Sequence, residues 1–545
     1  MSYSLNQSVN AAINRALALI GYNVHNDALK HYEFMRRTIL ADDSLAENEK
    51  PEAIRSLTES YDAYKIIINQ GSKRICENCK QECFATLYCE LCVRNYLKEK
   101  FVNWTSGNVD IDNLIQECQI NSFKPIKIPE WIPYNNLQNI QYLTKGGCSE
   151  IYTADRVDGA YYKWDSKEKQ LIRIGRQKVI LKKLENVENA NQSWFEEAKS
   201  HLILSNKWPC IVQCFGLTQD LTSGSYMLVM TKMNMDLRRY LQQNHNEMTW
   251  RKRIKIVTDI IIALNSIHRE NAIHRDLHSG NVLLIFDQRF VISDLGFCGP
   301  AHKPLTSIYG NLPYIAPEVI IGKEQTFKSD VYSIAMLMWE ISSGQPPFIN
   351  YNHNYYFAMN IVNGMRPKIV PGTPLEYKSL MKQCWDADPS KRPDVVTLWK
   401  KINEINLHYQ NKSNYLLTLL PVNNDNLEVM SSVENYTSTT SKLYHFDNFP
   451  EPKNATEEEQ EVLHSKSYNF YIPNNIVDFD KLSNQKNNTS KITNMFKDVQ
   501  NEDRRILMQQ HINNHYIIVI DEDEVYNNPN LHSEDQDELE LPDGN

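Results

Sequence analysis

Hydrophobic and polar residues alternate differently along successive parts of the chain. In residues 1–72, as in the stretch VNAAINRALALIGYNVHNDALKHYEFMRRTIL, apolar residues recur at intervals of three and four. That spacing gathers them on one face of a helix, so it predicts a helical N-terminal region. Residues 137–410 instead alternate short strand-like runs with longer helix-like runs, and no long linker interrupts them. We expect one folded domain of mixed strands and helices there.

Two other regions have a distinct composition. Residues 73–130 hold five closely spaced cysteines, followed by the stretch WTSGNVDIDNLIQECQ, which has the pattern of a capped helix. Residues 411–545 are rich in asparagine, serine and acidic residues, as in EPKNATEEEQE and SNQKNNTSK. Segments of this kind bury too little apolar surface to offset the entropy of folding, so we expect a disordered acidic tail.

Composition and charge narrow the class of protein. The chain has 545 residues, of which 41% are hydrophobic and 23% charged, and its net charge is −9. This composition is typical of a globular protein and gives no basic field, so no nucleic-acid partner is expected. No apolar run reaches the length of a membrane span, and the N-terminus lacks a signal-peptide pattern. We therefore expect the cytoplasm or nucleus and no membrane association, with the 11 cysteines as thiols or metal ligands.

The residues with the clearest chemical meaning form a series of short motifs. Seven follow one another: KGG (145–147), VILK (179–182), IHRDLHSGNVLL (273–284), VISDLGF (291–297), YGNLPYIAPEV (309–319), KSDVYS (328–333) and CWDADPSKRP (384–393). Each is weak alone, but their order and spacing match the protein-kinase signature. The segment therefore resembles a protein kinase domain, and its last motif resembles the tyrosine-kinase-like branch. The whole chain is similar to expanded fungal kinase families in which a cysteine-pair segment precedes the kinase.

This resemblance implies a fold and a set of catalytic roles. The fold is α+β and bilobal, with a small β-rich N-lobe and a larger helical C-lobe. Lys182 would hold the α- and β-phosphates of ATP and pair with Glu197. Asp276 would orient or deprotonate the acceptor hydroxyl. Asn281 and Asp294 would bind Mg²⁺, a hard ion that takes oxygen ligands.

The nucleotide-binding residues follow from the same resemblance. They are Thr144, Lys145, Gly146, Gly147, Cys148, Ser149 and Ile151 in the phosphate loop, Met230 at the back of the adenine pocket, and Thr231 to Met233 on the hinge. The loop carries threonine and serine at two of the three usual glycine positions. It keeps Gly146, where the backbone can approach the phosphates closely, so we expect weaker ATP binding and not its loss. The stretch DGAYYKWDSKEKQ (158–170) is expected to be an inserted loop between early strands.

Activity and acceptor type each leave two alternatives. All four polar groups required for phosphoryl transfer are present, which favours an active enzyme in intracellular signalling. The alternative is a pseudokinase scaffold that binds partners or nucleotide without efficient catalysis. The motif GNLPYIAPE is similar to that of Ser/Thr kinases, whereas Asn311 replaces the usual threonine there and His278 replaces the lysine that most Ser/Thr kinases have in the catalytic loop. We expect Ser/Thr specificity, with dual specificity as the alternative.

Other motif residues are expected to have structural or regulatory roles. The family pattern implies that Glu318 pairs with Arg392 and that Asp330 supports the catalytic loop. Arg275 indicates activation by phosphorylation, because a phosphate on the activation segment would give this arginine a partner. The candidate acceptors of that phosphate are Thr306, Ser307 and Tyr309.

The cysteine cluster has the spacing of a metal site. The stretch CENCKQECFATLYCELC contains two C-x₂-C pairs separated by nine residues. The four cysteines of these pairs are Cys76, Cys79, Cys89 and Cys92. We expect them to form a closed structural zinc site, with Cys83 as a spare or alternative ligand. A helical hairpin with free buried thiols is the alternative.

One short motif in the tail indicates a partner. Residues 517–524 read IIVIDEDE, a β-prone run followed directly by acidic residues. Such a run can add a strand to the edge of a partner's sheet, and this one resembles a motif that binds the small ubiquitin-like modifier. A chance hydrophobic patch and an intramolecular strand are the alternatives. The pattern does not determine the oligomeric state, the physiological substrate or the role of the N-terminal helices.

Overall fold

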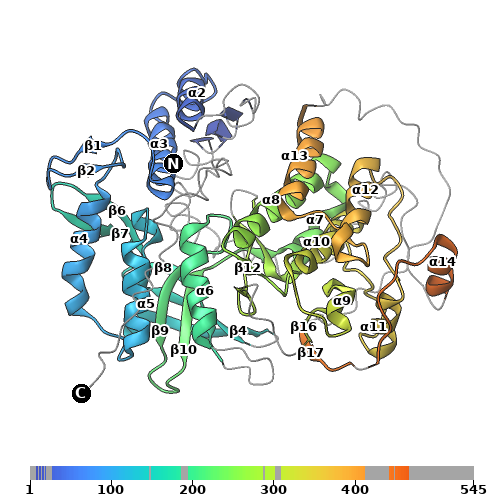
Figure 1. The fold of residues 1–545 in the computed structure, drawn as a ribbon. Helices are drawn as coiled ribbons and strands as arrows, with labels where there is room; N and C mark the ends of the chain where they lie inside the picture. The colour runs from blue at the N-terminus through green and yellow to red at the C-terminus, as the bar shows by residue number, and fades with distance from the viewer. Residues whose placement is uncertain are drawn as a thin grey trace, which may run out of the picture. The chain divides into compact units, whose positions relative to one another are not determined.

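The structure, a computed structural model, describes residues 8–9, 11–13, 15–16, 19, 28–146, 149–185, 194–285, 289–300, 308–411, 441–446 and 448–465. These residues group into two compact units, whose elements are labelled in Figure 1. Unit 1 contains the described residues up to Ile128 together with Asp158–Gln177. Unit 2 contains Pro129–Val157 and the described residues from Lys178 onwards.

Unit 1 begins with helices that pack through their apolar faces. Helices α2 (Ala28–Leu40) and α3 (Lys50–Ile68) enclose a cluster of apolar side chains that includes Ile39 and Leu57. These side chains recur at helical spacing, which is why the sequence pattern indicates helices here. Helix α3 ends at Asn69, whose φ of 53° is left-handed and whose N–H bonds back to the last turn.

The cysteine region of unit 1 combines a small hairpin with two helices. Strands β1 (Arg74–Ile75) and β2 (Glu82–Cys83) pair antiparallel, and α4 (Glu90–Lys100) and α5 (Val109–Ile120) follow. Helix α5 begins after Asn108, whose side chain accepts hydrogen bonds from the first backbone N–H groups of the helix. Those groups have no partner within the helix, so the asparagine fixes where it starts.

The segment expected as an inserted loop folds as a hairpin. Its strands β6 (Tyr161–Asp165) and β7 (Gln170–Arg173) pair antiparallel and belong to unit 1, although the strands that flank them in sequence belong to unit 2. Trp164 packs edge-on against Tyr96 of α4, with 5.7 Å between ring centroids. The insertion therefore completes the apolar core of the N-terminal unit.

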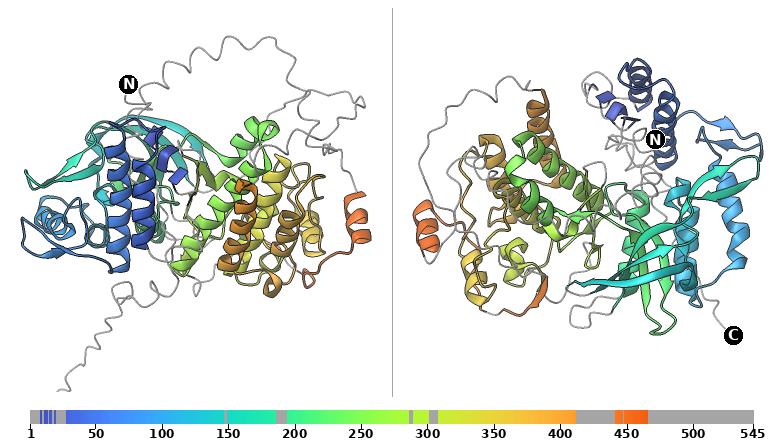
Figure 2. Two further views of the ribbon diagram at one scale, coloured as in Figure 1. Left: turned by 90° about the horizontal axis from the view of Figure 1, so that it is seen from above. Right: turned by 180° about the vertical axis from the view of Figure 1, so that it is seen from behind.

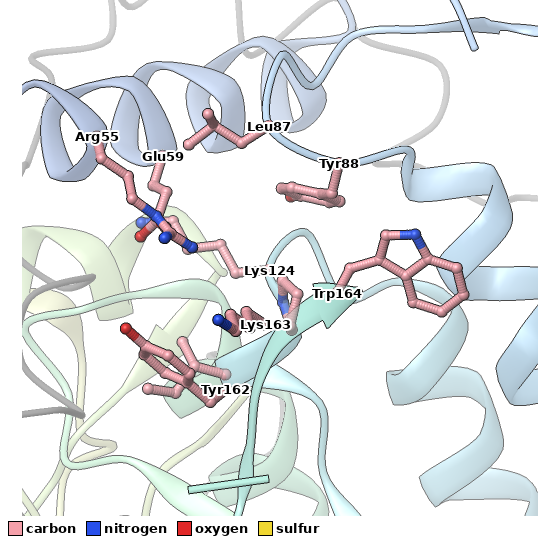
Figure 3. A pocket seen from close by; sticks show the side chains of 10 residues that line it. Arg55, Glu59, Leu87, Tyr88, Lys124, Tyr162, Lys163 and Trp164 are labelled. Atoms are coloured by element: carbon pink, nitrogen blue, oxygen red, sulfur yellow. The ribbon is translucent and has the colours of Figure 1, made fainter. Parts of the chain in front are cut away.

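Unit 1 also contains a pocket between α3 and β6 (Figure 3). Arg55 and Glu59 reach it from α3, and Tyr162 and Lys163 from β6. Burial lowers the pKa of Lys124, which also lines the pocket, to about 8. The lining mixes charges of both signs and contains none of the predicted catalytic, nucleotide-binding or zinc-binding residues.

Unit 2 opens with a six-stranded sheet in the order β3-β9-β10-β8-β5-β4. The strands are β3 (Glu130–Trp131), β4 (Leu137–Lys145), β5 (Glu150–Arg156), β8 (Gln177–Lys183), β9 (Cys214–Gln219) and β10 (Tyr226–Thr231). Strand β3 runs parallel to β9 and approaches it closely at Gly216. A Cβ atom there would lie 1.8 Å from the Glu130 carbonyl oxygen, so only glycine fits. Helix α6 (Trp194–Lys207) packs on this sheet.

The rest of unit 2 is largely helical. Its helices are α7 (Leu237–Asn244), α8 (Trp250–Arg269), α9 (Pro317–Ile320), α10 (Phe327–Ser343), α11 (Tyr355–Val362), α12 (Leu375–Cys384) and α13 (Val395–Asn411). Short strands between them are β11 (Met235–Asp236), β12 (Ala272–Ile273), β13 (Val282–Leu284), β14 (Phe290–Ile292), β15 (Gly299–Pro300) and β16 (Ile308–Gly310). Helix α10 is buried on all sides after its first turn and contacts α8 and α12. A β-rich part followed by a helical part confirms the expected α+β, two-lobed fold.

The region expected as a disordered tail needs one correction. Residues 442–444 form strand β17 and residues 457–465 form helix α14, and both belong to unit 2. Backbone pairing with β16 and side-chain contacts with other helices hold this segment, as described below, so composition alone misjudged it.

Among the helices that the structure describes, none has both the length and the apolar character needed to cross a bilayer.

Candidate active site and cysteine cluster

A buried lysine connects three elements of unit 2. Lys182 lies on β8 and is 7% exposed. Its Nζ is 2.6 Å from Glu197 Oε1 on α6 and 2.5 Å from Asp294 Oδ1. Burial alone would lower the pKa of Lys182, but the two carboxylates outweigh it and raise the pKa. The ammonium therefore stays charged and fixed in place, as a group that holds phosphate must be.

The sequence favours Glu197 over its neighbour Glu196 as the partner of this lysine, because adjacent helix positions face different sides. The structure places Glu197 buried against Lys182 and leaves Glu196 exposed on the same helix.

Replacing Glu197 with glutamine is expected to lower kcat/KM for a peptide substrate by about 100-fold, because Lys182 loses a charged partner and shifts. Steady-state phosphorylation measures this effect. Glu196→Gln is the matched control and should change the rate by less than about twofold, since exposed charges contribute little. Equal losses in the two variants would contradict the assigned pairing.

The loop after β12 carries two further predicted residues. Asp276 is 7% exposed, and the Asn281 side-chain Nδ2 donates to the Asp276 carbonyl oxygen at 2.9 Å. Burial, and then the nearby carboxylate of Asp294, raise the pKa of Asp276 to about 7. A carboxylate with such a pKa can accept a proton from a hydroxyl near neutral pH.

Asp330 on α10 holds this loop in shape. Its carboxylate accepts hydrogen bonds from the backbone N–H groups of His274, at 2.9 Å, and Arg275, at 3.0 Å. Arg275 has a φ of 70°, a left-handed conformation that a non-glycine residue keeps only when its surroundings hold it. The structure thus gives Asp330 the supporting position that the family pattern implies.

Asp294 is oriented from several sides. Its φ is 56°, and its Oδ1 accepts from the Gly296 N–H at 3.3 Å as well as from Lys182. The next residue, Leu295, donates its N–H to His201 Nε2 on α6 at 3.2 Å. Burial lowers the pKa of His201 to about 3, so the ring is neutral and can accept this bond.

Asn281 and Asp294 fit a hard divalent cation. The amide nitrogen of Asn281 is engaged by the loop, which leaves its Oδ1 as the atom that can face a cation. The Asp294 side chain is 41% exposed and has its second carboxylate oxygen available. Oxygen donors of this kind suit Mg²⁺, whose coordination shell is completed by water and phosphate oxygens.

The predicted phosphate loop lies between β4 and β5. Thr144 pairs with Ile151 and Lys145 with Glu150, so the two strands lead the chain into and out of the turn. The Gly146 N–H donates to the Ser149 carbonyl at 2.8 Å. A Cβ atom at position 146 would make only an ordinary contact, at 3.6 Å from that same oxygen. Two predicted loop residues lie outside the described part of the chain, namely Gly147 and Cys148.

The predicted adenine-pocket residues lie at the end of β10. Met230 and Thr231 are 6% and 4% exposed, and Met233 on the following segment is half-buried. Because β10 pairs with β8, with Leu228 opposite Lys182, the hinge and the buried lysine belong to neighbouring strands of one sheet. The predicted site residues therefore all belong to unit 2: Lys182 with its partner Glu197, the carboxylates of Asp276 and Asp294, the amide of Asn281, and the hinge.

Comparison with known proteins agrees with this geometry. Residues 138–402 match the family described as protein tyrosine and serine/threonine kinase. Residues 138–402 form a protein kinase domain. The "dual specificity protein kinase zakA" of Dictyostelium discoideum is 32% identical over 196 residues, which cover 33% of this chain and 25% of that protein. The human "dual serine/threonine and tyrosine protein kinase" is 34% identical over 176 residues, or 32% of this chain and 18% of that protein. The chain thus spans a quarter or less of the length of these two relatives.

The kinase domain contains a buried ion pair where the family pattern implies one. Arg392 donates two hydrogen bonds to the Glu318 carboxylate, at 2.8 and 2.7 Å, and both residues are buried. Ser329 adds a third bond to Glu318 at 3.1 Å. This pair ties the end of the activation segment to the chain after α12.

One candidate acceptor of an activating phosphate is described in this kinase domain. Tyr309 is 5% exposed, and its ring stacks on Phe297 with 3.7 Å between centroids. Its hydroxyl would have to leave this stack before a kinase could modify it. Thr306 and Ser307 lie outside the described residues, and the proposed activating role remains a prediction.

Sequence reasoning missed one residue that lies against Asp276, the predicted catalytic aspartate, namely Ser441. The Ser441 hydroxyl donates to Asp276 Oδ1 at 2.9 Å and lies 3.1 Å from His278 Nε2. Ser441 is 165 positions from Asp276 in a serine-rich stretch, so no local pattern could assign it. His278 was noted as a departure from the usual catalytic-loop lysine, but its contact with Ser441 was not predicted.

The four predicted zinc ligands of unit 1 converge. The Sγ atoms of Cys76 and Cys92 are 3.7 Å apart, as are those of Cys79 and Cys89, and all four Sγ atoms lie within 4.8 Å of one another. Tetrahedral coordination with Zn–S bonds of about 2.3 Å predicts Sγ separations of about 3.8 Å. Cys83 packs beside these cysteines but is not one of the four that converge, and its thiol donates to the Ala85 carbonyl. The donor set and its geometry fit a zinc ion.

Proposed function

We propose that the chain transfers the γ-phosphoryl group of ATP to hydroxyls of proteins, foremost to serine and threonine. The observation that carries this proposal is the junction of Lys182 with Glu197 and Asp294, at 2.6 and 2.5 Å. A scaffold that only binds partners has no need to keep a buried lysine charged between two carboxylates. Dual specificity is the alternative for the acceptor type, in line with the names of the two relatives.

Each residue of the site has a defined task in this proposal. Lys182 holds the non-transferred phosphates, and Asp276 orients the acceptor hydroxyl and takes its proton. Asn281 and Asp294 supply oxygens to Mg²⁺, which when bound screens the charge of the phosphates. Catalysis in this scheme comes from positioning and charge stabilisation, so the altered phosphate loop affects ATP affinity more than the transfer step.

The experiment that tests this proposal compares ATP-dependent phosphorylation of a general protein acceptor by the wild type and by Lys182→Met. The wild type should transfer phosphate, whereas the phosphorylation rate of Lys182→Met should be lower by at least about 100-fold. The variant lacks the ammonium group that pairs with Asp294 and would hold the phosphates of ATP. Equal signals from both preparations would indicate a contaminating kinase and would favour the pseudokinase scaffold.

We also propose that Cys76, Cys79, Cys89 and Cys92 bind one structural Zn²⁺. Closed Cys₄ coordination leaves no position for a substrate, so the ion would stabilise unit 1 and take no part in transfer. The support is the convergence of the four thiols within 4.8 Å. Free buried thiols remain the alternative.

Metal analysis of the purified chain is expected to find about one Zn²⁺ per molecule. Cys79→Ser should abolish stoichiometric binding and lower the thermal stability of unit 1, since metal binding there contributes to folding. Cys83→Ser is the matched control, because Cys83 packs beside the four thiols without being one of the proposed ligands, and it should retain the metal. Wild-type protein without zinc would contradict the assignment.

Two remaining proposals concern location and partners. Residues 517–524 lie outside the described part of the chain, so binding of the small ubiquitin-like modifier rests on the sequence pattern alone. Location in the cytoplasm or nucleus likewise rests on the sequence.

A further inference from the structure

A segment from beyond the kinase domain returns to its catalytic loop. Strand β17 pairs antiparallel with β16 of the activation segment, with Leu443 opposite Tyr309 and Lys442 opposite Gly310 (Figure 1). Both views in Figure 2 show the chain continuing from β17 to α14 along the helical part of the domain. The strand therefore lies where an extended peptide would have to lie to present a side chain to the catalytic aspartate.

The residue just before β17 presents a hydroxyl to that aspartate. Ser441 is 7% exposed, and its Oγ lies 2.9 Å from Asp276 Oδ1. His278 Nδ1 accepts a hydrogen bond from the Gly280 N–H at 3.0 Å, so the proton of a neutral ring is on Nε2. That Nε2–H donates to Ser441 Oγ at 3.1 Å. The hydroxyl proton of Ser441 must then point to Asp276, which is the orientation that a phosphate acceptor needs.

Aromatic contacts fix the segment after the strand. Tyr355 of α11 stacks on Phe449 with 4.8 Å between ring centroids and meets Phe446 edge-on at 6.3 Å. Phe446 also stacks on Tyr444 at 5.4 Å. These rings bury apolar surface on both sides of the contact.

Polar contacts extend the attachment as far as α14. Asn454 Oδ1 accepts from the Ala387 N–H at 2.9 Å, and the Lys453 N–H donates to the Val362 carbonyl at 3.1 Å. His464, 4% exposed, donates from Nε2 to the Arg366 carbonyl at 2.9 Å. These bonds use backbone groups of the kinase domain, so they depend on where the segment lies and not on its net charge.

The surface under the segment is shaped to receive it. Gly364 has a φ of 97°, and a Cβ atom there would lie 2.3 Å from the Ala455 backbone nitrogen. Any larger side chain would push the segment away from the domain.

We propose that residues 441–465 form an intramolecular substrate segment, in which Ser441 is the phosphate acceptor and the bound segment excludes other protein substrates. This inference rests on the proposed kinase activity. In the transfer step, Ser441 Oγ forms a bond to the γ-phosphorus of ATP and the bond from that phosphorus to the bridging oxygen breaks. ADP leaves with that oxygen, and the hydroxyl proton passes to Asp276.

The product of this step destabilises its own binding. Phosphoserine 441 carries a charge of about −2 and lies against the carboxylate of Asp276, with that of Asp294 nearby. Like charges in a buried site repel strongly, so phosphorylation releases β17 and opens the site to other substrates. Until then the segment competes from within the same molecule, at an effective concentration of about 1 mM or above.

The first arm of the test uses the full-length chain without nucleotide. Trypsin cleavage after Lys453 reports whether the segment is docked, since a docked backbone must detach before a protease can cut it. In the variant Phe446→Ala/Phe449→Ala/Asn454→Ala, cleavage should be at least about tenfold faster than in the wild type. Glu458→Gln, an exposed residue of α14, is the matched control and should be cleaved at the wild-type rate. Equal cleavage of wild type and triple variant would overturn the docking.

The second arm adds ATP and Mg²⁺ to phosphatase-treated protein. Mass spectrometry should find phosphate on Ser441, with a first-order rate constant that does not change on dilution. The KM for an exogenous peptide should fall by about tenfold after this incubation, and the triple variant should show the low KM from the start. Ser441→Ala should keep the high KM throughout, because its segment stays docked and cannot be released.

The outcomes separate this inference from the proposed function. A wild-type chain that phosphorylates the peptide but leaves Ser441 unmodified overturns the acceptor role of Ser441. If neither the wild type nor the triple variant phosphorylates any acceptor, the proposed kinase activity and the acceptor role of Ser441 are both overturned. The proteolysis experiment still decides in that case whether the segment is docked.

Discussion

Asp276→Asn is expected to lower kcat by a factor of about 10² to 10⁴, the range over which a positioned proton acceptor contributes to catalysis. Asparagine keeps the shape of the side chain and can still accept the hydrogen bond from Ser441, but it cannot take a proton. Burial and the Asp294 carboxylate raise the pKa of Asp276 to about 7 in the folded protein. Steady-state kinetics with a peptide acceptor measures the loss.

The thermal stability of Asp276→Asn, compared with that of the wild type, is the control for this prediction. A carboxyl group whose pKa is raised by folding stabilises the protein below its unfolded pKa, and this stabilisation is lost as the pH rises through about 7. At pH 8 the wild type carries a buried charge that Asp276→Asn lacks, so the melting temperature of the variant should be equal or higher. A variant that keeps wild-type kcat would contradict the role of Asp276, and one that melts well below the wild type would indicate a structural defect instead.

Glu318→Ala is expected to lower the free energy of unfolding by about 3–5 kcal/mol, because it leaves a buried guanidinium without its carboxylate. Arg392 is 1% exposed, and the carboxylate that it loses accepts two of its hydrogen bonds, at 2.8 and 2.7 Å. Chemical denaturation followed by fluorescence measures the loss.

An exposed ion pair in the same domain provides the comparison. Lys255 and Asp259 lie 2.9 Å apart on α8, and the lysine side chain is 47% exposed. Lys255→Ala should lower the free energy of unfolding by less than about 1 kcal/mol, as is usual for exposed pairs. If Glu318→Ala lowered it no more than Lys255→Ala does, burial would not be what makes the pair of Glu318 and Arg392 important for stability. The double variant Glu318→Ala/Arg392→Ala should cost less than the sum of the single changes, since it leaves no unpaired charge.

The kinase fold was predictable because its evidence lies in short motifs with fixed spacing. The pattern around Lys182 and Asp294 requires a particular backbone approach to phosphate and metal, and few other residue types can supply it. The four clustered thiols were predictable for the same reason, since two C-x₂-C pairs bring their sulfurs together through local turns. In both cases the distances that matter follow from a few neighbouring residues.

The hairpin of residues 158–170 shows where this kind of reasoning stops. Its sequence marks an insertion, but the decision that it belongs to unit 1 depends on Trp164 packing against Tyr96, two residues far apart in the chain. Composition also failed for residues 441–465. Their polar character is typical of disorder, yet pairing with β16 and contacts with Tyr355 give them a defined position.

The sequence by itself determined the two-lobed fold and the chemical groups of its site, since these depend on residue types at fixed local spacing. Only the tertiary structure decided which far-separated residues meet without a motif to predict them: the inserted hairpin with unit 1, and Ser441 with Asp276. Such contacts are set by backbone pairing and buried surface between distant segments, and no local pattern encodes them.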